Sequence, residues 1–208
     1  MIMTADLSHP EAQTFDRALS TAAGVLARRG LHGLNTASVA QEVAAATGLD
    51  PAAFRRAFPT RLDLAYAIAL HSAHALVRDQ LADDGPGTPQ ERMERLVRRH
   101  IRHCRDHRTE EDVRRTVLPA LRAVHPGRHR ELADVRLAYR EHLRGLIAEG
   151  AEQGVFPVSS AGAAAATVLE ALESVVSWYD PDDGLSEAEL GDVYTDLIIH
   201  HHLGSPRA

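Results

Sequence analysis

The sequence contains no lysine and a single cysteine, Cys104. One cysteine excludes a disulfide within the chain, and nothing in this usage indicates an oxidising compartment. Aromatic residues make up only 4% of the chain while alanine is frequent, which favours close-packed helices over a β-sandwich. No apolar run reaches the roughly 20 residues needed to span a bilayer. The first residues also lack the basic and apolar segments of a secretory signal, so we expect a cytoplasmic protein with no membrane partner.

The positive charge of the sequence is carried entirely by arginine, so every fixed cation can make forked contacts to phosphate or guanine. The formal net charge is −6, but it is unevenly distributed. Residues 1–61 hold six arginines and five acidic residues, whereas the remainder of the chain is clearly acidic. A protein that bound nucleic acid through its whole surface should be more basic. A protein that binds it with only its N-terminal quarter need not be.

Apolar residues recur at three- and four-residue spacing along most of the chain, which predicts an all-α fold. Ser38 begins an S-x-x-Q capping-box pattern, so it is the expected start of the second helix. Asp50 is the expected cap of the third helix, with Pro51 at its first position. No segment has a convincing strand pattern. The pattern predicts about nine helices, at residues 11–29, 38–47, 51–58, 60–81, 90–107, 110–125, 127–153, 159–179 and 186–203.

Residues 38–58 form two short predicted helices joined by a turn that contains Gly48, which is the spacing of a helix-turn-helix. In this motif the second helix enters the major groove of DNA. A helical wheel at about 100° per residue places one side of that helix in the core, with Phe54, Ala57 and Phe58. The same wheel turns Ala52 and Arg56 directly outward and puts Ala53 and Arg55 on the two flanks.

These outward side chains suit DNA, because alanine can meet a thymine methyl group and arginine can grip guanine or phosphate. The helix N-termini at Asp50 and Thr60 add backbone N–H groups for phosphates. The alternative is that the short helices belong to an ordinary bundle and that the adjacent arginines form a solvated face. The candidate DNA-binding residues are Ser38, Thr47, Asp50, Pro51, Ala52, Ala53, Arg55, Arg56, Thr60 and Arg61.

The first 60 residues resemble the N-terminal domain of TetR-family transcriptional regulators. The segments that carry the resemblance are ALSTAAGVLARRG, SVAQEVAAATG, LDPAAFRRAF and FPTR. Near the C-terminus, GLIAEGAEQGVFP resembles the end of the family's long seventh helix, and SWYDPDDGLSEAEL resembles the junction of its last two helices. The sequence departs from the family at Arg55 and Ala57, where tyrosine and histidine are common, and at Asp50, where serine is frequent. Arg55 and Ala57 are the two positions where we expect its DNA contacts to differ from those of a typical relative.

This resemblance implies a helix-turn-helix DNA-binding domain at residues 1–60 and a ligand-binding and dimerisation domain at 61–208. It further implies a homodimeric repressor that binds a near-palindromic operator and is released by a small-molecule effector. The last two helices would pair with their mates in the second copy. The apolar stripes expected there, for which intramolecular core is the alternative, are Val168, Leu172, Val175, Val176, Tyr179, Leu190, Val193, Leu197 and Ile198.

The resemblance also implies a ligand pocket among the middle helices. Its candidate lining residues, for each of which a place in the core is the alternative, are Met93, Leu96, His100, Cys104, Leu121, Tyr139 and Trp178. Their composition would suit a small, mostly hydrophobic effector. The alternative function is an all-helical small-molecule-binding or enzymatic protein that no longer binds DNA.

Metal binding and catalysis have little support in the sequence. His100, His103, Cys104 and His107 share one helix, which can supply only two or three ligands in good geometry, and nearby arginines repel cations. No glycine-rich phosphate loop and no G-x-S-x-G motif is present. We therefore expect no metal, no cofactor and no catalytic residue.

Overall fold

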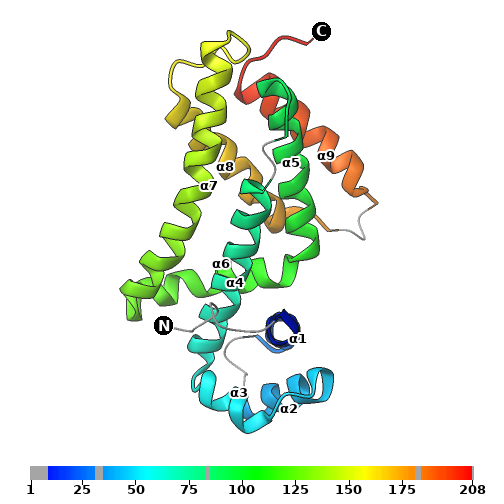
Figure 1. Ribbon diagram of the computed structural model, residues 1–208, viewed down its shortest axis with the longest axis vertical. Coiled ribbons are helices and arrows are strands. Elements are labelled where there is room, and N and C mark those ends of the chain that lie inside the picture. The colour runs from blue at the N-terminus through cyan, green and yellow to red at the C-terminus, as the bar shows by residue number, and fades with distance from the viewer. Residues whose placement is uncertain (1–8, 31–34, 83–84, 181–183, 208) are drawn as a thin grey trace. The chain divides into compact units, whose positions relative to one another are not determined.

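The computed structural model describes residues 9–30, 35–82, 85–180 and 184–207. These residues form nine α-helices and a π-helical segment, η2, that follows the last of them, and they contain no strand (Figure 1). The expected all-α fold is confirmed, and the expected helices are recognisable throughout. The elements are α1 (His9–Arg29), α2 (Thr36–Thr47), α3 (Pro51–Ala57), α4 (Arg61–Leu81), α5 (Pro89–Asp106), α6 (Arg108–Val124), α7 (Pro126–Glu152), α8 (Ala161–Trp178), α9 (Glu187–Asp196) and η2 (Leu197–His202).

The start of α2 differs from the sequence-based expectation. The helix begins at Thr36, because the side chain of Asn35 accepts a hydrogen bond from the Ala37 N–H at 2.9 Å and serves as N-cap. Asparagine is as effective a cap as serine, and it comes earlier in the chain. Ser38 therefore lies within the first turn, where its hydroxyl accepts a hydrogen bond from Arg29 of α1.

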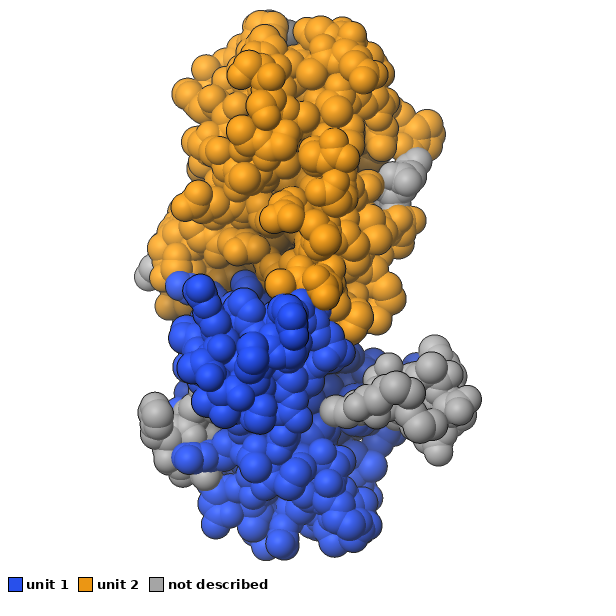
Figure 2. Space-filling model, turned by 90° about the vertical axis from the view of Figure 1, so that its left-hand side faces the viewer, with its two compact units in different colours: residues 1–72, 109–132 blue, residues 73–108, 133–208 orange. Residues whose placement is uncertain are grey.

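The chain divides into two compact units, which Figure 2 distinguishes by colour. Unit 1 comprises residues 1–72 and 109–132, and unit 2 comprises residues 73–108 and 133–208. Unit 1 thus combines α1–α3 with the first part of α4, nearly all of α6 and the start of α7. The functional division into a DNA-binding domain at 1–60 and a ligand-binding domain at 61–208 stays a prediction.

Within unit 1, the first turn of α6 is fixed to α1 and α4 by hydrogen bonds to two buried carboxylates. Ser20 of α1 donates a hydrogen bond to Glu110 at 2.7 Å, and Ser72 of α4 donates one to Glu111 at 2.9 Å. Arg114 Nε lies 2.8 Å from the other carboxylate oxygen of Glu111, and both side chains are buried. Buried charges are tolerated only when they are paired and hydrogen-bonded, and this cluster meets that condition.

Unit 2 is built around one apolar cluster contributed mainly by α5, α7, α8, α9 and η2. Along α5 the buried positions recur every three to four residues, so one stripe of this helix faces the core. The last turn of α7 closes against Phe156, which is fully buried and donates its N–H to the carbonyl of Gly150 at 3.1 Å. The largest fully buried side chains of the cluster include Leu76, Met93, Leu96, Ile101, Tyr139, Leu143 and Phe156.

We expect Gly150→Ala to destabilise the fold. A Cβ at this position would lie 2.1 Å from Cδ2 of the Phe156 ring, which has no open space to move into because it is buried. Overpacking of this kind costs about 1–3 kcal/mol, and urea denaturation should show it. Gly145→Ala in the same helix is the control, because its Cβ would meet no heavy atom within 4 Å beyond its chain neighbours and the backbone of its own helix, and alanine favours a helix by about 0.5–1 kcal/mol. Equal effects of the two substitutions would contradict the packing described here.

Candidate nucleic-acid interface

The helix-turn-helix predicted at residues 38–58 is formed by α2 and α3. Gly48 ends α2 in the left-handed conformation, with φ 76°, and its N–H bonds to the Ala44 carbonyl. A glycine fits this position because other residues pay a steric penalty at positive φ. Asp50 then caps α3 as expected, accepting hydrogen bonds from the N–H groups of Ala52 and Ala53 at 3.0 Å each.

Two aromatic side chains anchor α3. Phe54 and Phe58 are buried, and their rings meet edge to face with centroids 4.9 Å apart. The ring of Phe58 also lies 6.3 Å from that of Phe15 on α1. This contact links the third helix to the first, so a helix of seven residues that would be unstable alone is held in place.

The remaining side chains of α3 are exposed. Ala52, Ala53, Arg55 and Arg56 lie outward as the helical wheel predicted. The expectation for Ala57 was wrong, because this residue is exposed rather than buried. Within α3 only Phe54 is buried. The buried face of this short helix is therefore narrower than the one that the helical wheel predicted from Phe54, Ala57 and Phe58.

Eight of the ten candidate DNA-binding residues lie between Asp50 and Arg61, and all eight are exposed. The other two, Ser38 and Thr47, are half-buried at opposite ends of α2, and their hydroxyls make contacts within the protein. Thr47 donates to the Val43 carbonyl at 2.7 Å. The structure therefore places eight of the candidates on one exposed segment, residues 50–61, whereas Ser38 and Thr47 lie outside it on α2.

Arg56 forms a long, exposed ion pair with Asp50. Its Nη2 atom lies 3.7 Å from Oδ2 of Asp50, and the two side chains are 73% and 60% exposed. An exposed ion pair of this kind contributes about 0–1 kcal/mol. The pair is therefore weak enough for Arg56 to exchange Asp50 for a stronger anionic partner.

The N-terminus of α4 adjoins this segment and is rigidly capped. Thr60 and Asp63 cap one another, with the Thr60 N–H 2.9 Å from Asp63 Oδ2 and the Asp63 N–H 3.1 Å from Thr60 Oγ1. Burial would raise the pKa of the Asp63 carboxyl, but hydrogen bonds from Thr60 and from Arg128, at 2.7 Å, outweigh it and lower the pKa. Asp63 therefore stays ionised, and Arg128 balances its charge.

The predicted ligand-pocket residues have different surroundings, and their role in binding a ligand stays a prediction. Met93, Leu96, His100, Cys104 and Tyr139 are buried together in the core of unit 2, whereas Leu121 is buried in unit 1. His100 Nδ1 lies 3.1 Å from the Tyr139 hydroxyl, and burial raises the pKa of this tyrosine, so it keeps its proton.

Trp178, the remaining residue of that prediction, has a different environment. Its side chain is 49% exposed, and its Nε1–H donates to the Tyr194 hydroxyl at 3.0 Å. The two rings are stacked, with centroids 6.2 Å apart. Trp178 therefore lies at the surface formed by α8 and α9.

Most of the predicted dimer residues lie inside the subunit. A side chain that is already buried in its own chain offers little surface to a second copy. These residues are therefore packed within their own chain, whereas Val193 is exposed and Leu197 is half-buried. Whether they contribute to a dimer interface stays a prediction. The buried residues are Val168, Leu172, Val175, Val176, Tyr179, Leu190 and Ile198.

A surface pocket that the sequence analysis did not identify lies on α4 and α5, with a volume of about 290 Å³. Sequence reasoning considered two of its residues, His103 and His107, only as metal ligands. The signal that could have identified it is the recurrence of polar residues at 99, 103 and 106–107, along the edge of the core stripe of α5. Its lining residues are Asp79, Ala82, Arg99, Arg102, His103, Asp106 and His107.

In the part of the chain that the structure describes, no three His, Cys, Asp or Glu side chains come close enough together to hold a metal ion. Within the same residues, no helix combines the length and apolar character that a membrane span requires.

The fold and the helix-turn-helix define an all-helical protein of the kind that includes many DNA-binding regulators. The family model described as "Tetracyclin repressor-like, C-terminal domain" matches residues 86–201, more than half of the chain. The protein therefore belongs to the TetR family of transcriptional regulators. The resemblance found in the sequence is confirmed.

Three solved structures illustrate the likeness. The TetR-family regulator PfmR from Thermus thermophilus is 26% identical, with a TM-score of 0.75 over 89% of this chain and 98% of that one. A tetR-family regulatory protein from Rhodococcus RHA1 is 23% identical, with a TM-score of 0.78 over 94% and 99%. AibR, solved in complex with isovaleryl coenzyme A and operator DNA, is 19% identical, with a TM-score of 0.71 over 89% and 98%. No curated protein matches the sequence significantly.

Proposed function

We propose that the protein is a repressor that binds a near-palindromic operator as a homodimer and is released from it by a small-molecule effector. The observation that carries this proposal is the exposed face of α3, where Arg55 and Arg56 flank small residues on a helix anchored by Phe54 and Phe58. Arginine beside small side chains is the chemistry that reads base edges in a major groove. Residues 1–60 would bind DNA, and residues 61–208 would bind the effector and the second copy.

The surface of α8 and α9 supports the proposed homodimer. Trp178 of α8 and Val193 of α9 are 49% and 54% exposed, although both are large and apolar. A second copy packed on these helices would cover them, and such burial stabilises by about 25 cal/mol per Å².

Comparison with AibR supports the proposal that one protein of this fold binds both DNA and a small molecule, because AibR was solved with both isovaleryl coenzyme A and operator DNA. Its ligand is not assigned to this chain, whose effector we place only in the broad class of small molecules. We further propose that the protein is not an enzyme and requires no cofactor.

The direct test is retardation of DNA fragments from the gene's own promoter region by the purified full-length protein at low salt. Retardation of one fragment, with unrelated DNA in excess as competitor, supports the proposal. Failure to retard any such fragment would contradict it and favour an all-helical binding protein without DNA contact.

We expect Arg61→Ala to weaken binding by a similar factor on every DNA sequence. Arg61 is exposed at the first position of α4, where a cation is suited to a phosphate rather than to a base edge. The slope of log affinity against log salt should become shallower by about one for each subunit. Fluorescence anisotropy across a salt series measures this, with Arg115→Ala on the exposed face of α6 as the control. A change confined to one operator position would contradict a phosphate role.

A further inference from the structure

The pocket on α4 and α5 lies entirely within unit 2 and has its own chemistry. Its volume of about 290 Å³ is near the lower end of the size range of small-molecule sites, about 300–1,000 Å³. It borders the core stripe of α5, with the buried His103 in its lining, and none of the ligand residues predicted from the sequence lines it.

The acidic side chains of the pocket lie at its exposed rim, apart from its more buried inner wall. Asp79 and Asp106 are exposed at the rim, and Asp106 Oδ1 accepts hydrogen bonds from Arg105 Nε at 2.9 Å and Nη2 at 2.7 Å. That contact balances the charge of Asp106 from outside the pocket. Water screens the exposed carboxylate of Asp79.

The inner wall, in contrast, consists of side chains that donate hydrogen bonds. His103 is 4% exposed, and Arg99 and His107 are half-buried. The two imidazole rings lie 4.5 Å apart between centroids, so both can approach one group. Each neutral imidazole has one N–H donor, and the guanidinium adds a planar fork that matches a carboxylate.

We propose that this pocket binds a small organic carboxylate, whose charged end is held by Arg99 with the imidazoles of His103 and His107. A singly charged carboxylate fits better than a phosphate dianion, because the rim carboxylates repel the larger charge more strongly. The limited volume restricts the rest of the molecule to a small ring or a short chain.

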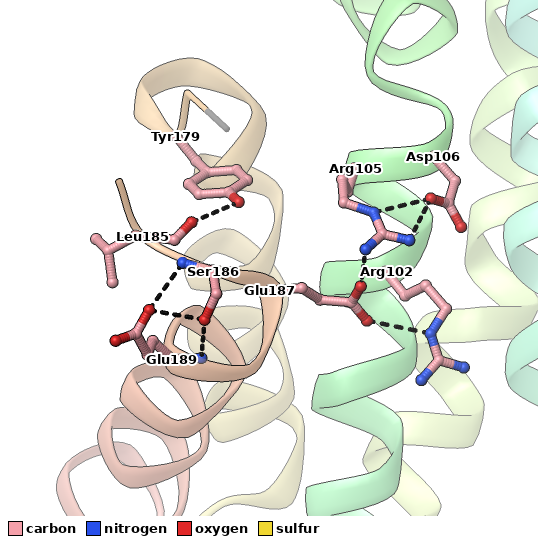
Figure 3. Close-up of polar contacts among 8 residues, drawn as sticks. All are labelled: Arg102, Arg105, Asp106, Tyr179, Leu185, Ser186, Glu187 and Glu189. Carbon is pink, nitrogen blue, oxygen red and sulfur yellow. Dashed lines mark hydrogen bonds and ion pairs between the residues drawn. The ribbon is translucent and has the colours of Figure 1, made fainter. Parts of the chain in front are cut away.

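Arg102 connects this pocket to α9. It lines the pocket, and its Nε donates to Glu187 Oε1 at 3.1 Å, while Arg105 contacts the other oxygen of Glu187 (Figure 3). Glu187 is the first residue of α9 and directly follows its N-cap, Ser186. A carboxylate held by Arg99 and the two imidazoles adds negative charge beside Arg102, which lines the same pocket, and so competes with Glu187 for the Arg102 guanidinium. Because coupling between two interactions is reciprocal, binding of the carboxylate weakens this link between α5 and α9.

Weakening of the α5–α9 link by the bound carboxylate would make the pocket an effector site. This role as an effector site rests on the proposed function. The proposed homodimer places α9 at the interface, so a weaker α5–α9 link shifts the population of dimer arrangements. The carboxylate then changes operator affinity through unit 2 without touching DNA.

Calorimetric titration of the full-length protein, in the absence of DNA, tests the site. Benzoate is the probe, and benzamide is its neutral control of the same shape. We expect benzoate to bind at least about ten times more tightly than benzamide, since hydrogen bonds to a charged group are stronger than neutral ones. Equal affinities of the two probes would overturn the proposal.

Three variants sharpen the test. Arg99→Met should reduce benzoate affinity about tenfold or more by removing the fork while keeping an unbranched side chain. Glu187→Gln should raise it about two- to fivefold, because Arg102 is released to the pocket. Arg140→Met, which removes an exposed arginine of α7 outside the pocket, should leave it unchanged. Unchanged binding by the folded Arg99→Met protein overturns the site, and unchanged binding by Glu187→Gln overturns its coupling to α9.

The two proposals fail separately in this design. Loss of benzoate binding together with intact retardation of promoter DNA would overturn the carboxylate pocket and leave the regulator. Benzoate binding with no retardation of any promoter fragment would support the pocket and contradict the DNA-binding function.

Discussion

Arg56→Ala should abolish specific operator binding while the proposed dimer stays intact. Arg56 lies on the exposed face of α3, and its pair with Asp50, at 3.7 Å, is too weak to hold it away from DNA. A guanidinium that reads a base contributes about 1–3 kcal/mol of discrimination. A homodimer loses this contribution at both half-sites, so specific affinity should fall by about 30-fold to 10⁴-fold.

Anisotropy titrations with operator and with scrambled DNA measure this loss, and sedimentation measures the oligomeric state. The scrambled DNA should lose much less affinity than the operator, because non-specific binding depends on total charge. Arg115→Ala is the matched control, since it removes one exposed arginine of unit 1 outside the helix-turn-helix. An equal loss on both DNAs would place Arg56 on a phosphate instead of a base.

Arg114→Leu should lower the free energy of unfolding by about 3–5 kcal/mol, the usual cost of breaking a buried ion pair. Arg114 and Glu111 are 6% and 4% exposed at the side chain, and their charged atoms are 2.8 Å apart. The substitution removes the guanidinium and leaves a desolvated carboxylate that also accepts from Ser72. The first turn of α6 should therefore loosen from α4.

Urea denaturation provides the measurement. Arg122→Leu on the exposed face of the same helix should change stability by no more than about 0.5 kcal/mol. The double variant Glu111→Gln, Arg114→Leu should recover much of the loss, because it removes both charges at once. A double variant as unstable as the single one would show that packing by the arginine, rather than its charge, is what stabilises α6.

The sequence was sufficient where a local rule acts alone. Asp50 and Pro51 specify the start of α3 by capping and by a fixed φ, and the structure has this start. Phe54 and Phe58 fall on one side of any helix at these positions, so their burial followed from spacing. The family, too, followed from short segments that recur at fixed distances, and the comparison with known proteins confirmed it.

Local rules failed where two neighbours could play the same role. Asn35 and Ser38 are both good helix caps. The capping-box pattern favoured Ser38 as the start of the second helix, whereas Asn35 is the N-cap in the structure. The apolar stripe of α8 shows the same limit, because Val168 and Leu172 would look identical in a core and in an interface. The α4–α5 pocket was missed because its lining comes from two parts of the chain, and its histidines on the α5 side were considered only as metal ligands.

The position of Trp178 has a practical consequence. It is the only tryptophan of the chain, it is half-exposed, and its ring stacks on Tyr194 across the junction of α8 and α9. Indole emission depends on contact with water, so the protein contains an intrinsic fluorophore at the surface proposed for self-association. Dilution of the unlabelled protein can therefore be followed optically, and the colour of the emitted light reports whether this surface is covered.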